Sequence, residues 1–264
     1  MPVIVALCSW ATVPERGFAP LIDLHCHILP GVDDGALDLS DSVAMARQAA
    51  DDGIEAICAT PHIRHDHDVR IEEMVERVEV VNERLRDEGV PVTVLQGGEV
   101  AETAVEALGE EELSRVALGS GRWVLLEPAP GALTESLVRR VAHLADRGYG
   151  ALIAHPERHL SADMYDRIAG LIGDGALIQA TADFFLREGG IGEGMRSLAA
   201  AGLIHVLSSD AHSSHGGRPV RLSAAFEKLR ELEPMAPHVE WMAEIAPRAI
   251  VDGGEMDVPF APAL

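Results

Sequence analysis

The 264-residue sequence has little positive charge and few cysteines. It contains 21 lysines and arginines against 43 aspartates and glutamates, a formal net charge of −22 at pH 7. So acidic a chain repels nucleic acid and anionic membrane surfaces unless a local basic site intervenes, and we expect neither as a partner. The three cysteines, Cys8, Cys26 and Cys58, form an odd set without C-x-x-C spacing. This argues against a disulfide framework or a structural zinc knot and fits a reducing cytoplasm.

The sequence also lacks a long apolar segment near its start. The apolar run at 3–8 has no basic region before it and is far too short to span a bilayer, so residues 1–20 are expected to be a lead-in extension without an export signal. Hydrophobic residues make up 47% of the chain, enough to bury a large core. An α/β barrel of this length is commonly a single domain, which is the default expectation here.

Short apolar or β-branched runs alternate with longer segments of helical period, a pattern typical of βαβ units around a parallel sheet. Seven runs are predicted to be strands: 21–27, 54–60, 92–99, 123–127, 151–155, 176–181 and 204–210. Five segments are predicted to be helices: 40–52, 71–88, 134–147, 162–173 and 192–201. Gly53, Gly89 and Gly148 end three of them in the usual way of C-terminal glycines. Residues 97–119 are ambiguous, and 247–264 are predicted to form a short helix and a loose tail.

A His-x-His pair ends the first predicted strand. Side chains alternate along a strand, so Asp23, His25 and His27 point to the same side and the two imidazoles converge. Imidazole suits Zn, Mn, Fe and Ni, but this pair alone is a weak signal.

The positions of other potential ligands strengthen that signal, because six of the seven predicted strands end in one. The residues are His25, His27, His62, Glu99, Glu127, His155, Asp210 and His212. The C-terminal ends of parallel barrel strands share one face, where the active sites of such folds gather. The loop after the first strand adds Asp33 and Asp34. One ion cannot use so many ligands, so the sequence predicts a cluster of two or three ions with mixed N/O ligands suited to Mn, Fe or Zn.

Taken in order, these motifs resemble those of the polymerase-and-histidinol-phosphatase (PHP) family. More narrowly, they resemble the bacterial PHP-type protein-tyrosine phosphatases associated with capsule and exopolysaccharide synthesis. The motifs are His25-Cys26-His27, Gly31-Val32-Asp33-Asp34-Gly35, Thr60-Pro61-His62, Gly98-Glu99, Leu126-Glu127, Ala154-His155-Pro156-Glu157-Arg158 and Ser208-Ser209-Asp210-Ala211-His212. The resemblance sets the expected boundaries: an extension over 1–20, a phosphatase domain over 21–251 and a tail over 252–264.

The resemblance implies an α/β fold, a distorted (β/α)7 barrel similar to a TIM barrel, with three metal sites. Matching motif positions assigns His25, His27, Glu99 and Asp210 to one ion, Glu99, Glu127 and His155 to a second, and Asp34, His62 and His212 to a third. Mn is the expected metal, with Fe or Zn as alternatives.

The resemblance also implies a reaction and a partner. A metal-bridged hydroxide would hydrolyse phosphotyrosine without a covalent phosphoenzyme. Arg158 and Arg218 match phosphate-binding positions, where a planar guanidinium can fork two phosphoryl oxygens, and His212 would take part in catalysis. The substrate would be a phosphotyrosine protein, such as the tail of a bacterial tyrosine kinase that regulates polysaccharide synthesis, in the cytoplasm.

Several alternatives compete with this interpretation. Cys58 and Arg64 fit the C-x5-R spacing of a thiolate phosphatase, but Pro61 removes a backbone donor that a phosphate cradle needs and the loop has no glycine. An amidohydrolase with a modified lysine between two metals is disfavoured, because the single lysine, Lys228, lies in a helical segment. A PHP phosphatase for histidinol phosphate or another small molecule, and a catalytically silent metal-binding regulatory domain, stay open.

Overall fold

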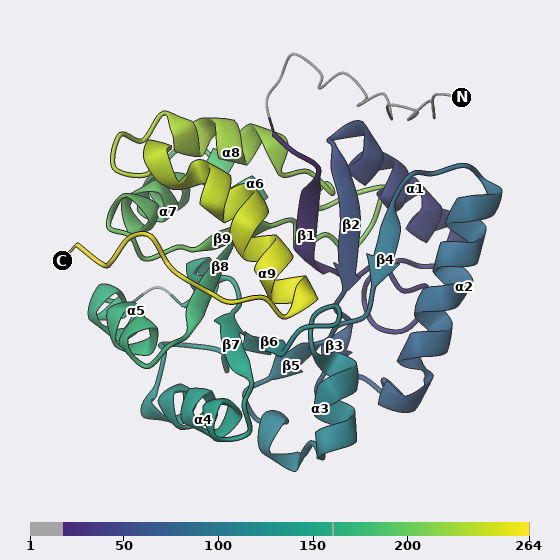
Figure 1. Cartoon of the computed structure of the whole chain (residues 1–264), viewed down its shortest axis with the longest axis horizontal. Helices are drawn as coiled ribbons and strands as arrows, with labels where there is room; N and C mark the ends of the chain where they lie inside the picture. Colours follow the sequence, from purple (N-terminus) through teal and green to yellow (C-terminus); the bar gives the residue numbers. More distant parts are fainter. Residues whose placement is uncertain (1–17, 160, 264) are drawn as a thin grey trace, which may run out of the picture.

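The structure, a computed structural model, describes residues 18–159 and 161–263. Its strands lie at the centre with helices around them (Figure 1). The strands are β1 (Leu21–Cys26), β2 (Ile54–Ala59), β3 (His62–Ile63), β4 (Thr93–Leu95), β5 (Glu99–Ala101), β6 (Trp123–Glu127), β7 (Gly150–Ile153), β8 (Leu177–Thr181) and β9 (Val206–Ser208). The α-helices are α1 (Leu39–Asp51), α2 (Met74–Asp87), α3 (Glu110–Val116), α4 (Glu135–Asp146), α5 (Met164–Gly173), α6 (Ala182–Leu186), α7 (Gly190–Ala200), α8 (Ser223–Arg230) and α9 (Ala246–Asp252). Short 3-10 turns occur at η1 (Ile71–Glu73), η2 (Val105–Ala107), η3 (Pro156–Arg158) and η4 (Ala236–His238), and η5 (Trp241–Ile245) is a π-helix.

All the strand pairs are parallel and form two sheets, in the orders β1-β2-β4 and β3-β5-β6-β7-β8-β9. The sheets join where the chain runs from β2 into β3 and from β4 into β5. The ring closes on its other side through a parallel bridge between Cys26 and Ala211, so that the end of β9 lies beside β1. Counting β2/β3 and β4/β5 as one position each gives seven positions, which confirms the predicted distorted (β/α)7 barrel.

Two of the predicted strands are broken in the structure. The run at 54–60 ends before Pro61, because proline has no N–H to continue the ladder. The run at 92–99 divides around Gly97, where a Cβ atom would lie 3.1 Å from the carbonyl oxygen of Ala59. Backbone hydrogen bonds still cross the break, since the amide of Glu99 donates to the Pro61 carbonyl over 3.0 Å. The breaks turn the ends of these strands toward the barrel axis, where His62 and Glu99 lie.

The remaining sequence predictions match the structure with small shifts of boundary. The ambiguous segment 97–119 contains β5, η2 and α3. The sequence predicts no helix at α6 or at α8. Helix α6, with five residues, is too short for a helical period to be recognised. The three predicted stop glycines, Gly53, Gly89 and Gly148, adopt φ angles of 84°, 66° and 75°, in the left-handed region that glycine enters without strain.

Helix α9 covers the N-terminal ends of the strands and crosses in front of them in Figure 1. The amide of Ser120, just before β6, donates to the carbonyl of Val251 over 2.7 Å. At Gly121 a Cβ atom would lie only 1.9 Å from the Ile250 carbonyl oxygen, so this approach requires glycine. The opposite end of the barrel, at the C-terminal ends of the strands, stays available for a site.

The tail is packed rather than loose as predicted. The ring of Phe260 stacks on His205 at 5.6 Å and meets Trp241 edge-on at 5.5 Å, and the amide of Ala263 donates to Ala201. Sequence periodicity could not reveal this, because an extended segment that packs by single aromatic anchors has no repeat. Residues 1–17, with most of the predicted extension, lie outside the described residues. No helix in the described part of the chain combines the length and apolarity needed to cross a membrane.

Strand β4 forms the outer edge of its three-stranded sheet, and α2 completes its hydrogen bonding. The buried Asn82 amide donates to the Val94 carbonyl and accepts from the Val94 amide, both at 2.8 Å. One side chain thus replaces the missing neighbouring strand at this position.

Replacing Asn82 with alanine should destabilise the fold, because both backbone groups of Val94 would lose their partner while buried. We expect a loss of roughly 2 to 3 kcal/mol in the free energy of unfolding. Urea unfolding followed by circular dichroism measures it, and Glu83→Ala on the exposed side of α2 is the matched control. Equal midpoints for the two variants would contradict the role of Asn82.

Candidate metal centre

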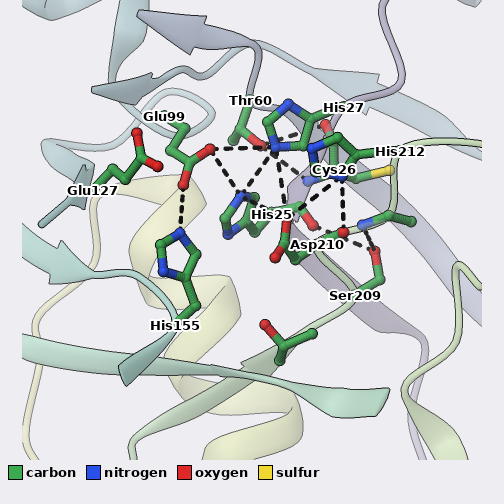
Figure 2. A network of polar contacts seen from close by, with 12 residues as sticks. His25, Cys26, His27, Thr60, Glu99, Glu127, His155, Ser209, Asp210 and His212 are labelled. Carbon is green, nitrogen blue, oxygen red and sulfur yellow. Dashed lines mark hydrogen bonds and ion pairs between the residues drawn. The ribbon is translucent and has the colours of Figure 1, made fainter. Parts of the chain in front are cut away.

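His25 and His27 meet a glutamate and an aspartate from other strands at the C-terminal end of the barrel. Their Nε2 atoms lie 3.2 Å apart. Glu99 Oε2 lies 3.4 Å and 3.3 Å from these two atoms, and Asp210 Oδ1 lies 3.5 Å and 3.7 Å from them. All four residues are buried, and Figure 2 shows their polar atoms converging. This is the set that the resemblance assigned to a first ion.

A second group surrounds Glu99 on its other side. His155 Nε2 lies 2.8 Å from Glu99 Oε1, and His62 Nδ1 lies 2.9 Å from Glu99 Oε2 and 3.8 Å from Glu127 Oε2. Figure 2 shows Glu127 beyond Glu99, on the side away from Asp210. Glu99 thus contacts both His155 and His62. The three side chains close enough to share an ion are His62, Glu99 and Glu127, whereas His155, a member of the predicted set, contacts Glu99.

The third group lies nearer to solvent. Asp34 Oδ1 lies 3.5 Å from His62 Nε2 and 3.6 Å from His212 Nε2, and His27 is also within reach of a shared ion. The side chain of Asp34 is 57% exposed, whereas that of His62 is buried. All nine predicted ligands therefore meet at one end of the barrel.

The polar atoms of these groups fit metal ions. Glu99 Oε2, Asp210 Oδ1 and His62 Nδ1 are buried and make no hydrogen bond of regular geometry with a described residue. They have only ion-pair contacts, with His62 Nδ1 2.9 Å from Glu99 Oε2 and Arg218 Nη2 3.1 Å from Asp210 Oδ1. Burying polar atoms unpaired is costly unless something else binds them. Ligands about 2.1 Å from an ion lie roughly 3 to 3.5 Å from one another. The separations within these groups, from 2.8 to 3.8 Å, lie around that range. Imidazole and carboxylate together suit Mn, Fe or Zn.

The electrostatics of the cluster also call for positive charge. Burial alone would lower the pKa of His27, but its hydrogen bond to Asp33 and the nearby Glu99 outweigh burial and raise this pKa to about 10. The surrounding histidines hold the pKa of Glu99 well below its usual range despite burial. Burial and the charge of His27 lower the pKa of His212 to about 4, which leaves it in the neutral form that binds metals.

Two further residues orient the histidines. The sequence points to Asp33 only as a possible ligand and does not point to Gln179. Asp33 Oδ2 accepts from His27 Nδ1 over 2.7 Å and from the His62 amide over 2.9 Å. Gln179 Oε1, from β8, lies 3.1 Å from His25 Nδ1. Such partners fix the tautomer and ring orientation of a ligating histidine. The Asp-Asp-Gly motif carried a signal for Asp33, but nothing in the sequence marked Gln179.

Two of the candidate ligands have strained backbones. Among the described residues other than glycine, His155 and Asp210 are the ones with positive φ, at 35° and 50°. This region is unfavourable for side chains larger than glycine and, where it occurs, is concentrated at functional sites. Below them, the buried Asp23 carboxylate accepts from the amide and hydroxyl of Ser209 and ties the end of β9 to β1.

The two predicted phosphate-binding arginines lie at the edge of the cluster. Arg158 Nη2 is 2.7 Å from Asp210 Oδ2, and Arg218 Nη2 is 3.1 Å from Asp210 Oδ1. Both guanidinium groups are partly exposed, so they can reach a ligand that enters from solvent. A third arginine, Arg64, lies 3.3 Å from Glu127 Oε1 on the opposite side and was considered in the sequence only as part of C-x5-R.

The fold and this cluster define a TIM-barrel-like protein with a candidate metal centre at the C-terminal ends of its strands. The family model described as capsular polysaccharide synthesis, CpsB/CapC, matches residues 21–233. The chain therefore belongs to the CpsB/CapC family.

Similar proteins of known name agree with this assignment. The chain is 34% identical to tyrosine-protein phosphatase YwqE of Bacillus subtilis over 204 residues, covering 73% of this chain and 78% of that protein. It is 29% identical to the putative tyrosine-protein phosphatase CapC of Staphylococcus aureus, covering 78% and 82%.

The comparison of structures gives the same result. A solved structure from work on YwqE of Bacillus subtilis and CpsB of Streptococcus pneumoniae, described as unique metal-dependent tyrosine phosphatases, superposes with a TM-score of 0.77 at 28% identity. The match covers 92% of this chain and 99% of that one. A β-aspartyl dipeptidase of Fervidobacterium islandicum, at 15% identity and a TM-score of 0.51, shares the fold alone.

His25→Ala should reduce the amount of bound metal, because it removes a ligand next to the shared Glu99. We expect the purified variant to contain at least one ion fewer per chain than the unmodified protein, measured by inductively coupled plasma mass spectrometry. His238→Ala, at the opposite end beneath Phe260, serves as the control and should keep the full content. Equal metal content in His25→Ala and the unmodified protein would contradict the site.

Cys58 should be inert in the folded protein. Its side chain is fully buried in β2, burial raises the pKa of its thiol, and Arg64 is paired with Glu127 and Asp66. We therefore expect no iodoacetamide labelling of Cys58 at pH 8 by mass spectrometry, and complete labelling once urea unfolds the chain. Labelling of the folded protein at the rate of a free thiol would revive the thiolate alternative.

Proposed function

We propose that this chain is a metal-dependent protein-tyrosine phosphatase, a phosphoric monoester hydrolase. The single observation that carries the proposal is the buried Glu99 carboxylate with four imidazoles around it, bordered by partly exposed arginines. The named relatives, tyrosine-protein phosphatases of the same family, support it. An intact set of ligands and arginines disfavours a catalytically silent domain.

The proposed ligands follow the grouping of the side chains. One ion takes His25, His27, Glu99 and Asp210, a second takes Glu99 and Glu127 with His155 or His62, and a third takes Asp34, His62 and His212. Two or three ions, with Mn the first choice, fit these mixed N/O ligands. Bound divalent ions supply Lewis acidity, which lowers the pKa of water and offsets charge on a phosphoryl group.

Arg158 and Arg218 are proposed to bind the phosphoryl oxygens. In the structure both guanidinium groups contact the Asp210 carboxylate, an anion at the edge of the cluster. A phosphoryl group is also anionic and can take up the same donors, and two planar guanidinium groups fix its orientation better than point charges would. His212 is proposed to act beside them, since its Nδ1 lies 3.2 Å from Arg218 Nη2.

Phosphotyrosine is the favoured substrate for a chemical reason as well. A phenolate leaves with a pKa near 10, far below that of an alkyl alcohol, so its departure needs little help from a general acid. We propose a cytoplasmic phosphotyrosine protein, such as a bacterial tyrosine kinase, as the partner. Histidinol phosphate and other small alkyl phosphates are the alternative substrates.

Replacing either arginine with alanine should weaken catalysis without emptying the metal sites. Charge-assisted hydrogen bonds contribute on the order of 2 kcal/mol, so kcat/KM should fall roughly thirtyfold for each variant. Arg→Lys should recover only part of the loss. Metal content is the control. Wild-type kcat/KM in both Arg158→Ala and Arg218→Ala would contradict the proposed binding of the phosphoryl oxygens by these arginines.

The function itself is tested by chelation and by a choice of substrates. Exhaustive chelation should abolish phosphatase activity and Mn should restore it. Matched peptides should show phosphotyrosine cleaved faster than phosphoserine, with histidinol phosphate a poor substrate. Full activity after verified metal loss would exclude a metal-dependent reaction. A clear preference for histidinol phosphate would instead favour the small-molecule alternative, and a clear preference for phosphoserine peptide would contradict the proposed phosphotyrosine substrate.

A further inference from the structure

A groove of about 380 Å³ opens beside the metal cluster, at the ends of β3, β5 and β6. Glu127 lies in both, because it lines the groove and belongs to the second ligand group. The groove is therefore continuous with the place where a phosphoryl group would bind. The groove is lined by Glu127, whereas Arg158 and Arg218 contact Asp210. Figure 2 shows Glu127 and Asp210 on opposite sides of Glu99.

The walls of the groove are apolar and held in place. One wall is the segment Pro128–Pro130. Ala101 and Thr103 also line the groove, together with the charged residues Arg64, Asp66, Glu102 and Glu127. The proline rings restrict the backbone of that wall. Two buried side chains from neighbouring loops also pin it.

These two side chains form hydrogen bonds with the two ends of the segment 129–131. The carboxylate of Glu102 accepts from the Ala129 amide over 3.0 Å. His159 Nδ1 lies 2.8 Å from the Gly131 carbonyl and donates to it. The wall is thus preorganised, so a ligand would not have to order it on binding.

Arg64 adds a flat cationic surface to the groove. Its guanidinium group is 3.3 Å from Glu127 Oε1 and 2.7 Å from Asp66 Oδ1, and Nη2 lies 3.2 Å from His67 Nε2. The contacts with Glu127 and His67 are hydrogen-bond contacts of Nη1 and Nη2, whereas Nε and Asp66 form an ion pair without hydrogen-bond geometry. The Arg64 side chain is 27% exposed, so part of the guanidinium group can meet an aromatic ring in the groove.

A second cavity near the cluster differs in chemistry. It lies beside Arg218 and is lined by Ser213, Ser214, His215 and two glycines. Those residues offer polar groups and flexible backbone rather than an apolar wall. Of the two cavities, only the groove beside Glu127 combines apolar surface, a wall held by hydrogen bonds and the Arg64 side chain.

We infer that this groove binds the aromatic ring of the substrate, with Arg64, Thr103, Pro128 and Pro130 determining the preference for aryl over alkyl phosphates. The inference rests on the proposed phosphatase function, which places the phosphoryl group at the cluster. The ring then extends from the cluster past Glu127, between the proline wall and Arg64. The preference for phosphotyrosine thus has a binding component in addition to the low pKa of the leaving phenol.

The test compares two non-hydrolysable ligands that share one head group. Benzylphosphonate and propylphosphonate are titrated into the metal-loaded protein and their affinities are measured by calorimetry. A half-buried phenyl ring contributes roughly a tenfold gain in affinity, so benzylphosphonate should bind about ten times more tightly. Thr103→Trp should fill the groove and reduce this ratio to about threefold or less.

Two further variants control the experiment. Thr103→Phe adds a smaller side chain and should lower the ratio to an intermediate value, which keeps the test valid if Thr103→Trp fails to fold. Ser197→Trp adds the same tryptophan to the exposed side of the outer helix α7 and should keep the full ratio. Metal content is measured for each variant.

The outcomes distinguish failure of the ring-binding inference from failure of the proposed phosphatase function. Equal affinity of the two phosphonates, or a ratio that survives both Thr103 variants, would overturn the groove even if aryl phosphates are hydrolysed. A ring preference that depends on Thr103, together with no hydrolysis of any phosphomonoester, would leave the groove standing and overturn the phosphatase proposal.

Discussion

One buried carboxylate holds the functional end of this barrel together. Glu99 is 1% exposed and lies within 3.4 Å of imidazole nitrogens from His25, His27, His62 and His155. Such a group is tolerated in a protein interior only when opposite charge or hydrogen-bond donors compensate it. The histidines come from three strand positions, so this requirement links the ends of β1, β3, β5 and β7. The breaks between β2 and β3 and between β4 and β5 contribute to this arrangement, because they lie just before His62 and Glu99.

The surroundings of the cluster fix its geometry from outside. Asp33 and Gln179 orient the two histidines of the first motif, and Asp23 ties β9 to β1 beneath them. Two of the candidate ligands, His155 and Asp210, have strained backbones with positive φ angles. Both of these residues leave a strand and must point back over its end, which an ordinary extended or helical conformation would not achieve. A site that depends on short distances between many polar atoms needs this support from rigid elements.

The cluster separates two kinds of surface. On the Asp210 side, Arg158 and Arg218 present partly exposed charge that suits an anion. On the Glu127 side, the groove between Arg64 and the proline wall presents apolar surface. A phosphate monoester likewise has two parts, a charged phosphoryl group and a leaving group. An aryl ester therefore complements both surfaces at once, whereas an alkyl ester of similar charge uses chiefly the first.

The sequence by itself determined the element pattern and the barrel class. It also led to nine proposed ligands that the structure places at one end of the barrel, because parallel strands bring whatever follows them to one common end. It could not determine which ligands share an ion. His62 contacts Glu99 and Glu127 as well as Asp34, and this depends on how far each strand reaches along the barrel axis. It also could not reveal Gln179, the packed tail around Phe260 or the groove. These arise from contacts between segments far apart in the chain, which leave no local period or motif, so only the tertiary structure decided them.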